Sequence, residues 1–159
     1  MDTIRAAHLA EAAELTELVM RSKAHWGYDQ AFLDSVRAEL TVRPEWLTAG
    51  QALVAERDGA PVGFGLLEGE ELSMLFVDPS AIGTGVGGAL YRALLELARS
   101  QGLPRLTVDA DPYAADFYAA MGARREGESP SGSIPGRMLP RFVIDLTPRQ
   151  RPAECPPGT

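Results

Sequence analysis

The sequence predicts one α/β domain, in which a single mixed sheet is flanked by helices. Its 159 residues are enough for one domain and too few for two cores of ordinary size. Strand-like runs alternate with helix-like runs in the order β-αα-βββ-α-β-α-β. The Asp58-Gly59 pair between two strand-like runs predicts a β-hairpin. Since such elements pack as layers around one core, we expect the domain to span residues 1–147 and a disordered tail to follow at 148–159.

The first third of the chain is expected to form one strand and two helices. Residues 3–6 are a short strand-like run, and apolar residues recur at helical spacing from 9 to 23. Asp29 is a suitable N-cap for the second helix, because its side chain can accept a hydrogen bond from an unpaired backbone N–H. Pro44 then opens a short turn or helix.

Three further strands are expected in the middle of the chain, at 51–56, 61–67 and 70–77. Strict alternation in the third of these strands predicts that its side chains form two separate faces. One face would carry Leu72, Met74 and Phe76, and the other would carry Glu71, Ser73, Leu75 and Val77.

The C-terminal part is expected to add a long helix, a strand, a short helix and a final strand. The long helix starts in a glycine-rich segment, and the next strand and helix fall at 106–110 and 112–121. The final strand is expected within 137–146. Residues 126–136 are rich in Gly, Ser and Pro, which predicts a loop.

Composition excludes several classes of function. Lys and Arg number 15 against 22 for Asp and Glu, a net charge of −7, so a nucleic-acid partner is not expected and an amine substrate is favoured. The N-terminus contains no apolar stretch typical of a signal or membrane span, so no membrane partner is expected. Cys155 and two histidines cannot build a metal centre, and Cys155 lacks a base that would make it a nucleophile. A cytoplasmic location is the default expectation.

A glycine-rich turn is the strongest candidate for a binding site. It follows a strand and opens a helix, where backbone N–H groups and the helix dipole favour an anion such as a pyrophosphate. The alternative is a tight connection that binds nothing. A dinucleotide or P-loop reading fits poorly, because the turn lies mid-chain and no Lys-Ser/Thr pair follows it. The turn comprises Ile82, Gly83, Thr84, Gly85, Val86, Gly87 and Gly88.

Two motifs at the proper separation resemble the GCN5-related N-acetyltransferase (GNAT) family. LFVDPSAIGTGVGGAL is similar to that family's acetyl-CoA signature, in which the turn reads Q/R-x-x-G-x-G/A, and DPYAADFYAAMGA is similar to its N-x-x-A-x-x-F-Y-x-x-x-G-F segment. Ile82 replaces the usual Gln or Arg, Asp111 stands where Asn is common, and Ala123 replaces Phe. A carboxylate at Asp111 cannot donate the hydrogen bond that an amide can. The element order matches the GNAT fold over nearly the whole chain.

The resemblance implies direct transfer of an acetyl group from acetyl-CoA to a primary amine in a ternary complex. Leu75, Phe76 and Val77 would run beside the pantetheine arm, and the turn and Asp111 would contact the rest of the co-substrate. Tyr118 falls on the family's general acid, although a tyrosine there could also simply fill space. Glu71 occupies the base position of some members, where it would act directly or through a water.

Residues around the expected acceptor site form two groups. His25, Trp26 and Tyr28 lie between the first two helices, where they would form an acceptor wall or else pack in the core. Ser131, Ser133 and Arg137 lie on or beside the 126–136 loop, which would be an acceptor rim or a plain connector.

Two functions from different classes therefore remain. The first is an N-acetyltransferase acting on an amine of a small molecule or peptide, with acetyl-CoA as co-substrate and no metal. Its oligomeric state stays open between a monomer and a homodimer, the state common among relatives. The second is a non-catalytic acyl-CoA-binding regulatory module. Glu71 and Tyr118 together favour the enzyme, because a binding module needs no proton donor at the thioester. Glu71 could equally be a solvated acid at a strand end.

Overall fold

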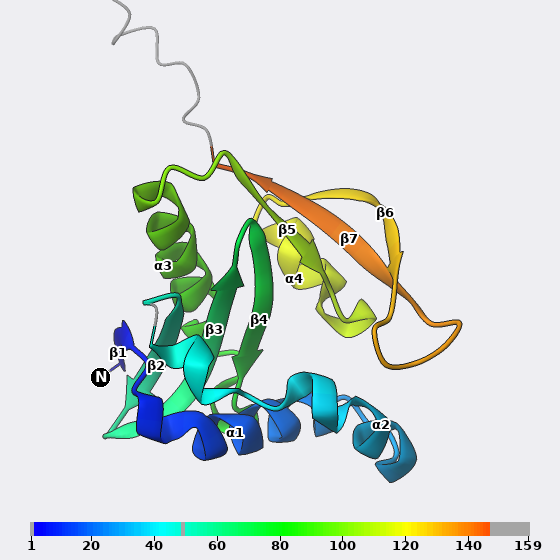
Figure 1. Cartoon of the computed structure of the whole chain (residues 1–159), viewed down its shortest axis with the longest axis horizontal. Helices are drawn as coiled ribbons and strands as arrows, with labels where there is room; N and C mark the ends of the chain where they lie inside the picture. The colour runs from blue at the N-terminus through cyan, green and yellow to red at the C-terminus, as the bar shows by residue number, and fades with distance from the viewer. Residues whose placement is uncertain (1, 49, 147–159) are drawn as a thin grey trace, which may run out of the picture.

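The computed structural model describes residues 2–48 and 50–146, in which seven strands form one mixed sheet (Figure 1). The strands are β1 (Asp2–Ala6), β2 (Ala52–Arg57), β3 (Ala60–Glu68), β4 (Glu71–Val77), β5 (Arg105–Asp109), β6 (Arg124–Pro130) and β7 (Met138–Asp145). The helices are α1 (Ala12–Ala24), α2 (Gln30–Leu40), α3 (Val86–Ser100) and α4 (Ala115–Ala120). Short 3₁₀ turns lie at Leu9–Glu11, Pro44–Leu47, Pro79–Ala81 and Pro112–Ala114. The expected tail from residue 148 lies outside the described residues.

The sheet has the order β1-β2-β3-β4-β5-β7-β6. All neighbouring strands in it are antiparallel except β4 and β5. The predicted hairpin joins β2 to β3, and positive φ angles of 52° at Asp58 and 81° at Gly59 are those that a tight hairpin turn requires. The predicted N-cap is also present, since the Asp29 side chain accepts a hydrogen bond from the Phe32 N–H at 2.9 Å.

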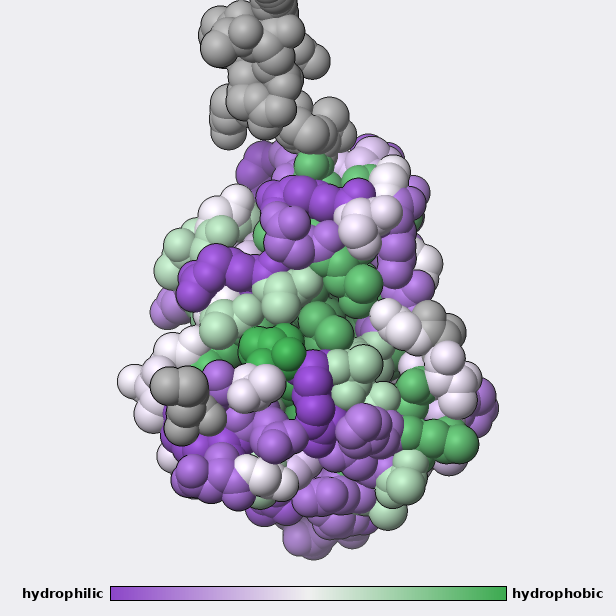
Figure 2. Space-filling model, turned by 90° about the vertical axis from the view of Figure 1, so that its left-hand side faces the viewer, coloured by the Kyte–Doolittle hydropathy of each residue, from purple (hydrophilic) through white to green (hydrophobic). Residues whose placement is uncertain are grey.

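The two faces of the sheet are covered by different helices. We call the buried cluster that α1 forms with β2, β3 and β4 the α1-side core, and the cluster of α3, α4, β5 and β7 the α3-side core. Gly65 of β3 lets α3 approach closely, because a Cβ there would lie 2.4 Å from the Leu94 side chain. Figure 2 shows the side of the molecule that bears α3 and β1, where a band of hydrophobic residues crosses the middle and hydrophilic residues cover the lower end.

Strand β4 contains a β-bulge that the sequence pattern does not reveal. Leu66 of β3 pairs with Met74, whereas Leu67 pairs with Leu72, so Ser73 has no residue opposite it. Because side chains alternate along a strand, one extra residue exchanges the two faces on either side of it.

The bulge places Glu71 on the face opposite to the one that strict alternation predicts. Leu72 joins the α3-side core, whereas Met74 joins the α1-side core. Val77, beyond the bulge, points toward α3, where a Cβ at Gly87 would lie 3.5 Å from it. Glu71 alternates with Leu72 and therefore lies on the α1 side of the sheet. The expectation that Glu71 and Val77 share a face is wrong, as is the grouping of Leu72 with Met74.

The expectation of a loop at 126–136 is wrong for its first five residues, because 126–130 belong to strand β6. Its residues pair antiparallel with β7, with an irregularity between Arg125 and Glu128. β6 is the last strand of the sheet, and it has no buried residue and no alternation of apolar and polar side chains. Backbone hydrogen bonds rather than side-chain burial hold it in place, so its composition resembles that of a loop. The remaining connection, 131–137, is called the β6–β7 loop below.

Candidate active site

A cleft opens where β4 and β5 separate. In the described part of the chain these strands are in register at the single pair Glu71 and Thr107, and Figure 1 shows β5 turning away from β4 beyond it. The cleft between them has a volume of about 480 Å³. Diverging strands leave backbone N–H and C=O groups unpaired on their facing edges, which suits an extended ligand that continues the sheet.

Most of the predicted site residues meet in this cleft. Those that line it are Trp26, Leu75, Phe76, Val77, Ile82, Gly83, Gly85, Gly87, Gly88, Asp111, Tyr118, Ser131, Ser133 and Arg137. Five others are not among its lining residues, namely His25, Tyr28, Glu71, Thr84 and Val86.

The glycine turn forms one end of the cleft. Gly83 and Gly85 have φ angles of 81° and 90°, which residues with a side chain rarely adopt, and Gly85 is the N-cap of α3. The helix therefore begins with unpaired N–H groups at a part of the cleft wall where Gly83, Gly85, Gly87 and Gly88 contribute no side chains. Thr84 and Val86 serve the turn itself, since the Thr84 hydroxyl donates to the Ala81 carbonyl and Val86 is buried. The arrangement suits an anionic group such as a phosphate.

Tyr118 presents a hydroxyl without a protein partner to the cleft. Its ring is 5% exposed and contacts Tyr91, Phe117 and Phe142 at centroid distances of 6.2, 5.3 and 5.7 Å. Among residues 2–48 and 50–146, no group hydrogen-bonds its hydroxyl. Burial, and to a smaller extent Tyr91, raises the pKa of Tyr118, so the phenol stays protonated and can donate. The hydroxyl of neighbouring Tyr91 is also unpartnered, but it is fully buried.

Glu71 lies beside a second carboxylate on the α1 side of the sheet. Burial raises the pKa of Glu71, and the negative charge of Asp109 raises it further. Asp109 lines the cleft and forms an ion pair with Arg141, whose Nη1 is 3.1 Å from Asp109 Oδ1. Glu71 is thus a carboxyl group with a raised pKa, and its neighbour in sequence, Leu72, lines the cleft whereas Glu71 itself does not.

A compact charged cluster closes the other end of the cleft. We call Lys23, Tyr28, Asp111 and Arg137 the Asp111 cluster. Lys23 Nζ lies 2.5 Å from Asp111 Oδ2, and the Tyr28 hydroxyl donates to both Asp111 oxygens at 3.0 Å. Arg137 Nη2 donates to the Tyr28 hydroxyl at 2.6 Å and lies 3.8 Å from Asp111 Oδ2. Burial raises the pKa of Asp111, but the hydrogen bond and charge of Lys23 outweigh this and hold that pKa below its ordinary value.

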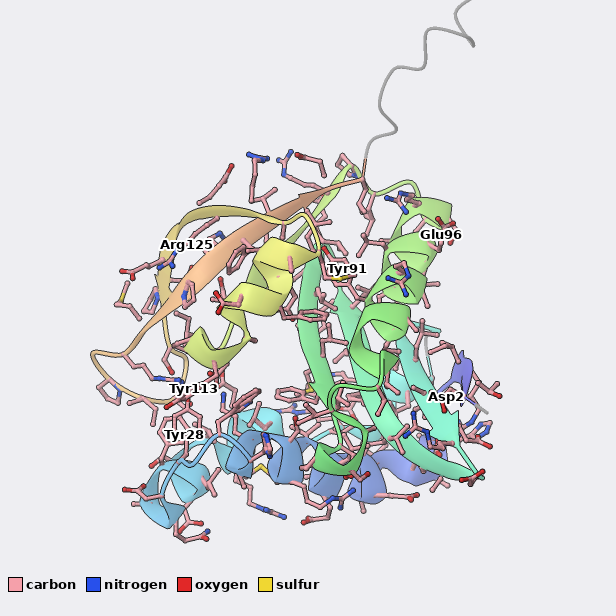
Figure 3. The ribbon with its side chains drawn as sticks, turned by 180° about the vertical axis from the view of Figure 1, so that it is seen from behind. Asp2, Tyr28, Tyr91, Glu96, Tyr113 and Arg125 are labelled. Carbon is pink, nitrogen blue, oxygen red and sulfur yellow. The ribbon has the colours of Figure 1, made fainter. Side chains whose placement is uncertain are left out.

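Aromatic side chains form the rim beside this cluster. Trp26 stacks on Tyr113 with ring centroids 5.5 Å apart, and both rings are partly exposed, at 37% and 55%. Tyr113 also meets Tyr28 edge to face, and Figure 3 shows these two residues next to each other at the α2 end of the molecule. Of the predicted acceptor wall, Trp26 therefore lines the cleft, Tyr28 supports it from behind, and His25 packs against Trp26 outside it.

The β6–β7 loop is fixed against α2. The Ser133 hydroxyl donates to Glu39 Oε1 at 2.7 Å, and Ser131 Oγ accepts from the backbone N–H of Ser133 and Ile134. Both serines line the cleft, so the loop forms its rim. Sequence reasoning missed further lining residues, and those with polar side chains include Lys23, Glu39, Ser73, Asp109 and Tyr113. Lys23 gave no signal, because a lysine in the last turn of a helix is ordinary.

The family model for the acetyltransferase (GNAT) domain matches residues 11–131. The chain belongs to the GNAT acetyltransferase family. The sequence-based assignment to this family, to its class of enzyme and to its mixed α/β fold is therefore confirmed at the level of the family.

Individual GNAT proteins resemble this chain to different extents. Peptidyl-lysine N-acetyltransferase YjaB of Escherichia coli K12 is 37% identical over 99 residues, which span 60% of this chain and 60% of that protein. A GCN5-related N-acetyltransferase from Rhodopseudomonas palustris has a TM-score of 0.78 and 28% identity, covering 92% of this chain and 96% of that one. PaiA N-acetyltransferase of Thermoplasma acidophilum, solved with coenzyme A, shares the fold with a TM-score of 0.74 and 16% identity, covering 91% of this chain and 99% of that one.

Two further findings concern metals and membranes. Within the described ranges, no three His, Cys, Asp or Glu side chains gather closely enough to hold a metal ion. No helix in the same ranges is both long and apolar enough to cross a membrane.

Proposed function

We propose that this protein transfers the acetyl group of acetyl-CoA to the side-chain amine of a lysine in a peptide or protein, by direct attack in a ternary complex. One observation carries the proposal: a single cleft brings together the glycine turn, the unpaired edge of β4 and the Tyr118 hydroxyl. The acceptor class is suggested by YjaB, which is a peptidyl-lysine N-acetyltransferase.

The residues present suit acetyl-CoA as co-substrate. The N–H groups of the turn would hold its phosphates, and Gly87 and Gly88 leave space for them, since both lie in the cleft wall without a side chain. Leu75, Phe76 and Val77 offer the backbone edge for the pantetheine arm. When bound, the co-substrate supplies an activated acyl group, and holding it beside the amine provides much of the rate enhancement.

Tyr118 serves as general acid in this proposal. A protonated phenol without another partner can donate to the departing thiolate, and its raised pKa keeps it protonated at neutral and mildly alkaline pH. The hydroxyl also argues against the non-catalytic alternative, because a module that only binds acyl-CoA gains nothing from leaving this donor unpaired.

Glu71 serves as base through a water in this proposal. Its position beside the cleft wall does not suit direct contact with the amine, because Asp109 rather than Glu71 lines the cleft. A raised pKa makes Glu71 a better proton acceptor than an ordinary carboxylate. Asp109 is already ion-paired with Arg141, which makes its carboxylate a weaker proton acceptor, so we assign the base role to Glu71. A homodimer and a cytoplasmic location remain predictions.

Thiol release from acetyl-CoA tests the proposed function. We expect release with a lysine-containing peptide, and none with the same peptide in which the lysine is already acetylated. Mass spectrometry of the product should place the new acetyl group on the lysine Nε. Tight binding of coenzyme A without thiol release on any lysine peptide would instead support the non-catalytic module.

A further inference from the structure

The Asp111 cluster carries one more positive than negative charge. It contains two cations, Lys23 and Arg137, and one anion, Asp111, which stays ionised because its pKa is lowered. The three side chains are 9%, 18% and 11% exposed, so little water screens them. A surplus charge in a shielded site interacts more strongly with a ligand than an exposed charge does.

Other charged residues in the cleft wall do not cancel this surplus. The Asp109 carboxylate is already paired with Arg141 at 3.1 Å. Glu39 is exposed and hydrogen-bonds the Ser133 hydroxyl, so solvent screens its charge. A ligand that enters the cleft beside Tyr113 therefore meets a shielded cation and no shielded, unpaired anion.

Arg137 also has hydrogen-bond donors left over. A guanidinium has five N–H groups, and in the described part of the chain Arg137 uses one of them, toward Tyr28. Its position is restrained, because the guanidinium carbon lies 4.8 Å from the Phe32 ring centre and 5.4 Å from that of Tyr28. A restrained guanidinium with unused donors is suited to a carboxylate, which it can bind through two parallel hydrogen bonds.

We infer that the amine acceptor carries a carboxylate close to its reactive amine, and that Arg137, assisted by Lys23, binds this carboxylate. For a peptide acceptor this means an Asp or Glu next to the target lysine. The phosphates of the co-substrate are the other anions that enter the cleft, but the glycine turn already offers them its own donors. Arg137 belongs instead to the β6–β7 loop, which packs against the α1–α2 wall. The inference rests on the proposed function and narrows its substrate class.

Two matched peptides test this inference. Both contain one lysine, flanked on each side by Glu in the first and by Gln in the second, with blocked termini. For the native chain we expect a kcat/KM for acetylation at least about tenfold higher with the Glu peptide, mostly through KM. Arg137→Gln should reduce this ratio to about threefold or less, and Arg137→Lys should retain part of it. Arg37→Gln removes the same charge from an exposed ion pair on α2 and should leave the ratio unchanged.

Calorimetry of both peptides with the coenzyme A complex measures the same preference without turnover. Lack of acetylation of either peptide would refute the proposed function alone, and the binding ratio would still decide the inference. Equal affinities and equal rates for the two peptides would overturn the inference while leaving the transferase function intact. A weaker affinity of Arg137→Gln for coenzyme A, with an unchanged peptide ratio, would assign Arg137 to the phosphates and overturn it as well.

Discussion

Replacing Tyr118 by Phe separates catalysis from folding in this protein. The substitution removes one oxygen and keeps the ring contacts with Tyr91, Phe117 and Phe142. Because no described group hydrogen-bonds that oxygen, we expect the free energy of unfolding to change by less than about 0.5 kcal/mol. If the hydroxyl protonates the leaving thiolate, kcat should fall by about 100- to 10,000-fold, which corresponds to roughly 2.7–5.4 kcal/mol of barrier height.

Tyr91→Phe is the matched control for this substitution. Tyr91 lies against Tyr118, but its hydroxyl is fully buried, unpartnered and outside the cleft wall. Removing a buried polar atom without a partner should increase stability, by about 1 kcal/mol, and leave kcat unchanged. Burial raises the pKa of Tyr91 to about 12, so this hydroxyl stays protonated throughout the assay range.

The assay follows thiol release between pH 6 and about pH 9.5, with thermal unfolding and coenzyme A affinity measured in parallel. Since its raised pKa keeps Tyr118 protonated over this range, the loss in Tyr118→Phe should be similar at every pH. Full activity of Tyr118→Phe in a folded protein would show that solvent protonates the thiolate. A loss shared equally by Tyr91→Phe would show that the two tyrosines affect packing rather than proton transfer.

Three further substitutions test other parts of the structure. Gly87→Ala fits at 3.5 Å from Phe117 and Val77 and removes a helical glycine, so thermal unfolding should show a gain of about 0.5–1 kcal/mol. Its methyl group on the cleft wall should still weaken coenzyme A binding by about fivefold or more in calorimetry, and an unchanged affinity would place the phosphates elsewhere. For Glu71, kcat/KM of the native chain should rise with pH through a pKa above the ~4.3 of free Glu, because only the ionised carboxylate accepts a proton. Glu71→Gln should lose most activity at acidic pH, whereas an equal loss at every pH would indicate a role in binding alone. Gly65→Ala should destabilise the fold by about 1–3 kcal/mol in denaturant unfolding, because its Cβ would lie 2.4 Å from Leu94, and unaltered stability would show that α3 can shift outward.

The elements that could be predicted from the sequence are those with a local signal. The hairpin depends on Asp58 and Gly59, and the second helix depends on Asp29, so each follows from residues adjacent in the chain. The glycine turn is likewise local, because its positive φ angles are properties of Gly83 and Gly85 themselves. These positions, and Tyr118 in its motif, could be found without knowing the fold.

Features that depend on pairing between distant strands could not be predicted in the same way. A bulge exists only relative to a partner strand, and Ser73 is the extra residue because of how Leu66 and Leu67 pair across the sheet. Strict alternation therefore assigned Glu71 to the wrong face. Strand β6 escaped prediction for a related reason, since an exposed edge strand needs no apolar alternation once a partner strand supplies its hydrogen bonds.

Asp111 departs from the family motif, and the structure gives this departure a role that the sequence alone does not indicate. In the sequence it is an Asn position that has lost a hydrogen-bond donor. In the structure its carboxylate gathers Lys23, Tyr28 and Arg137 through contacts between residues 83 to 109 positions apart, and none of these pairings has a local signal. A neutral Asn could not hold two largely buried cations, and two cations cannot be neutralised by one carboxylate. Asp111 therefore holds both cations in the cleft while neutralising the charge of only one of them, which leaves the partly unsatisfied guanidinium that our inference assigns to a carboxylate on the acceptor.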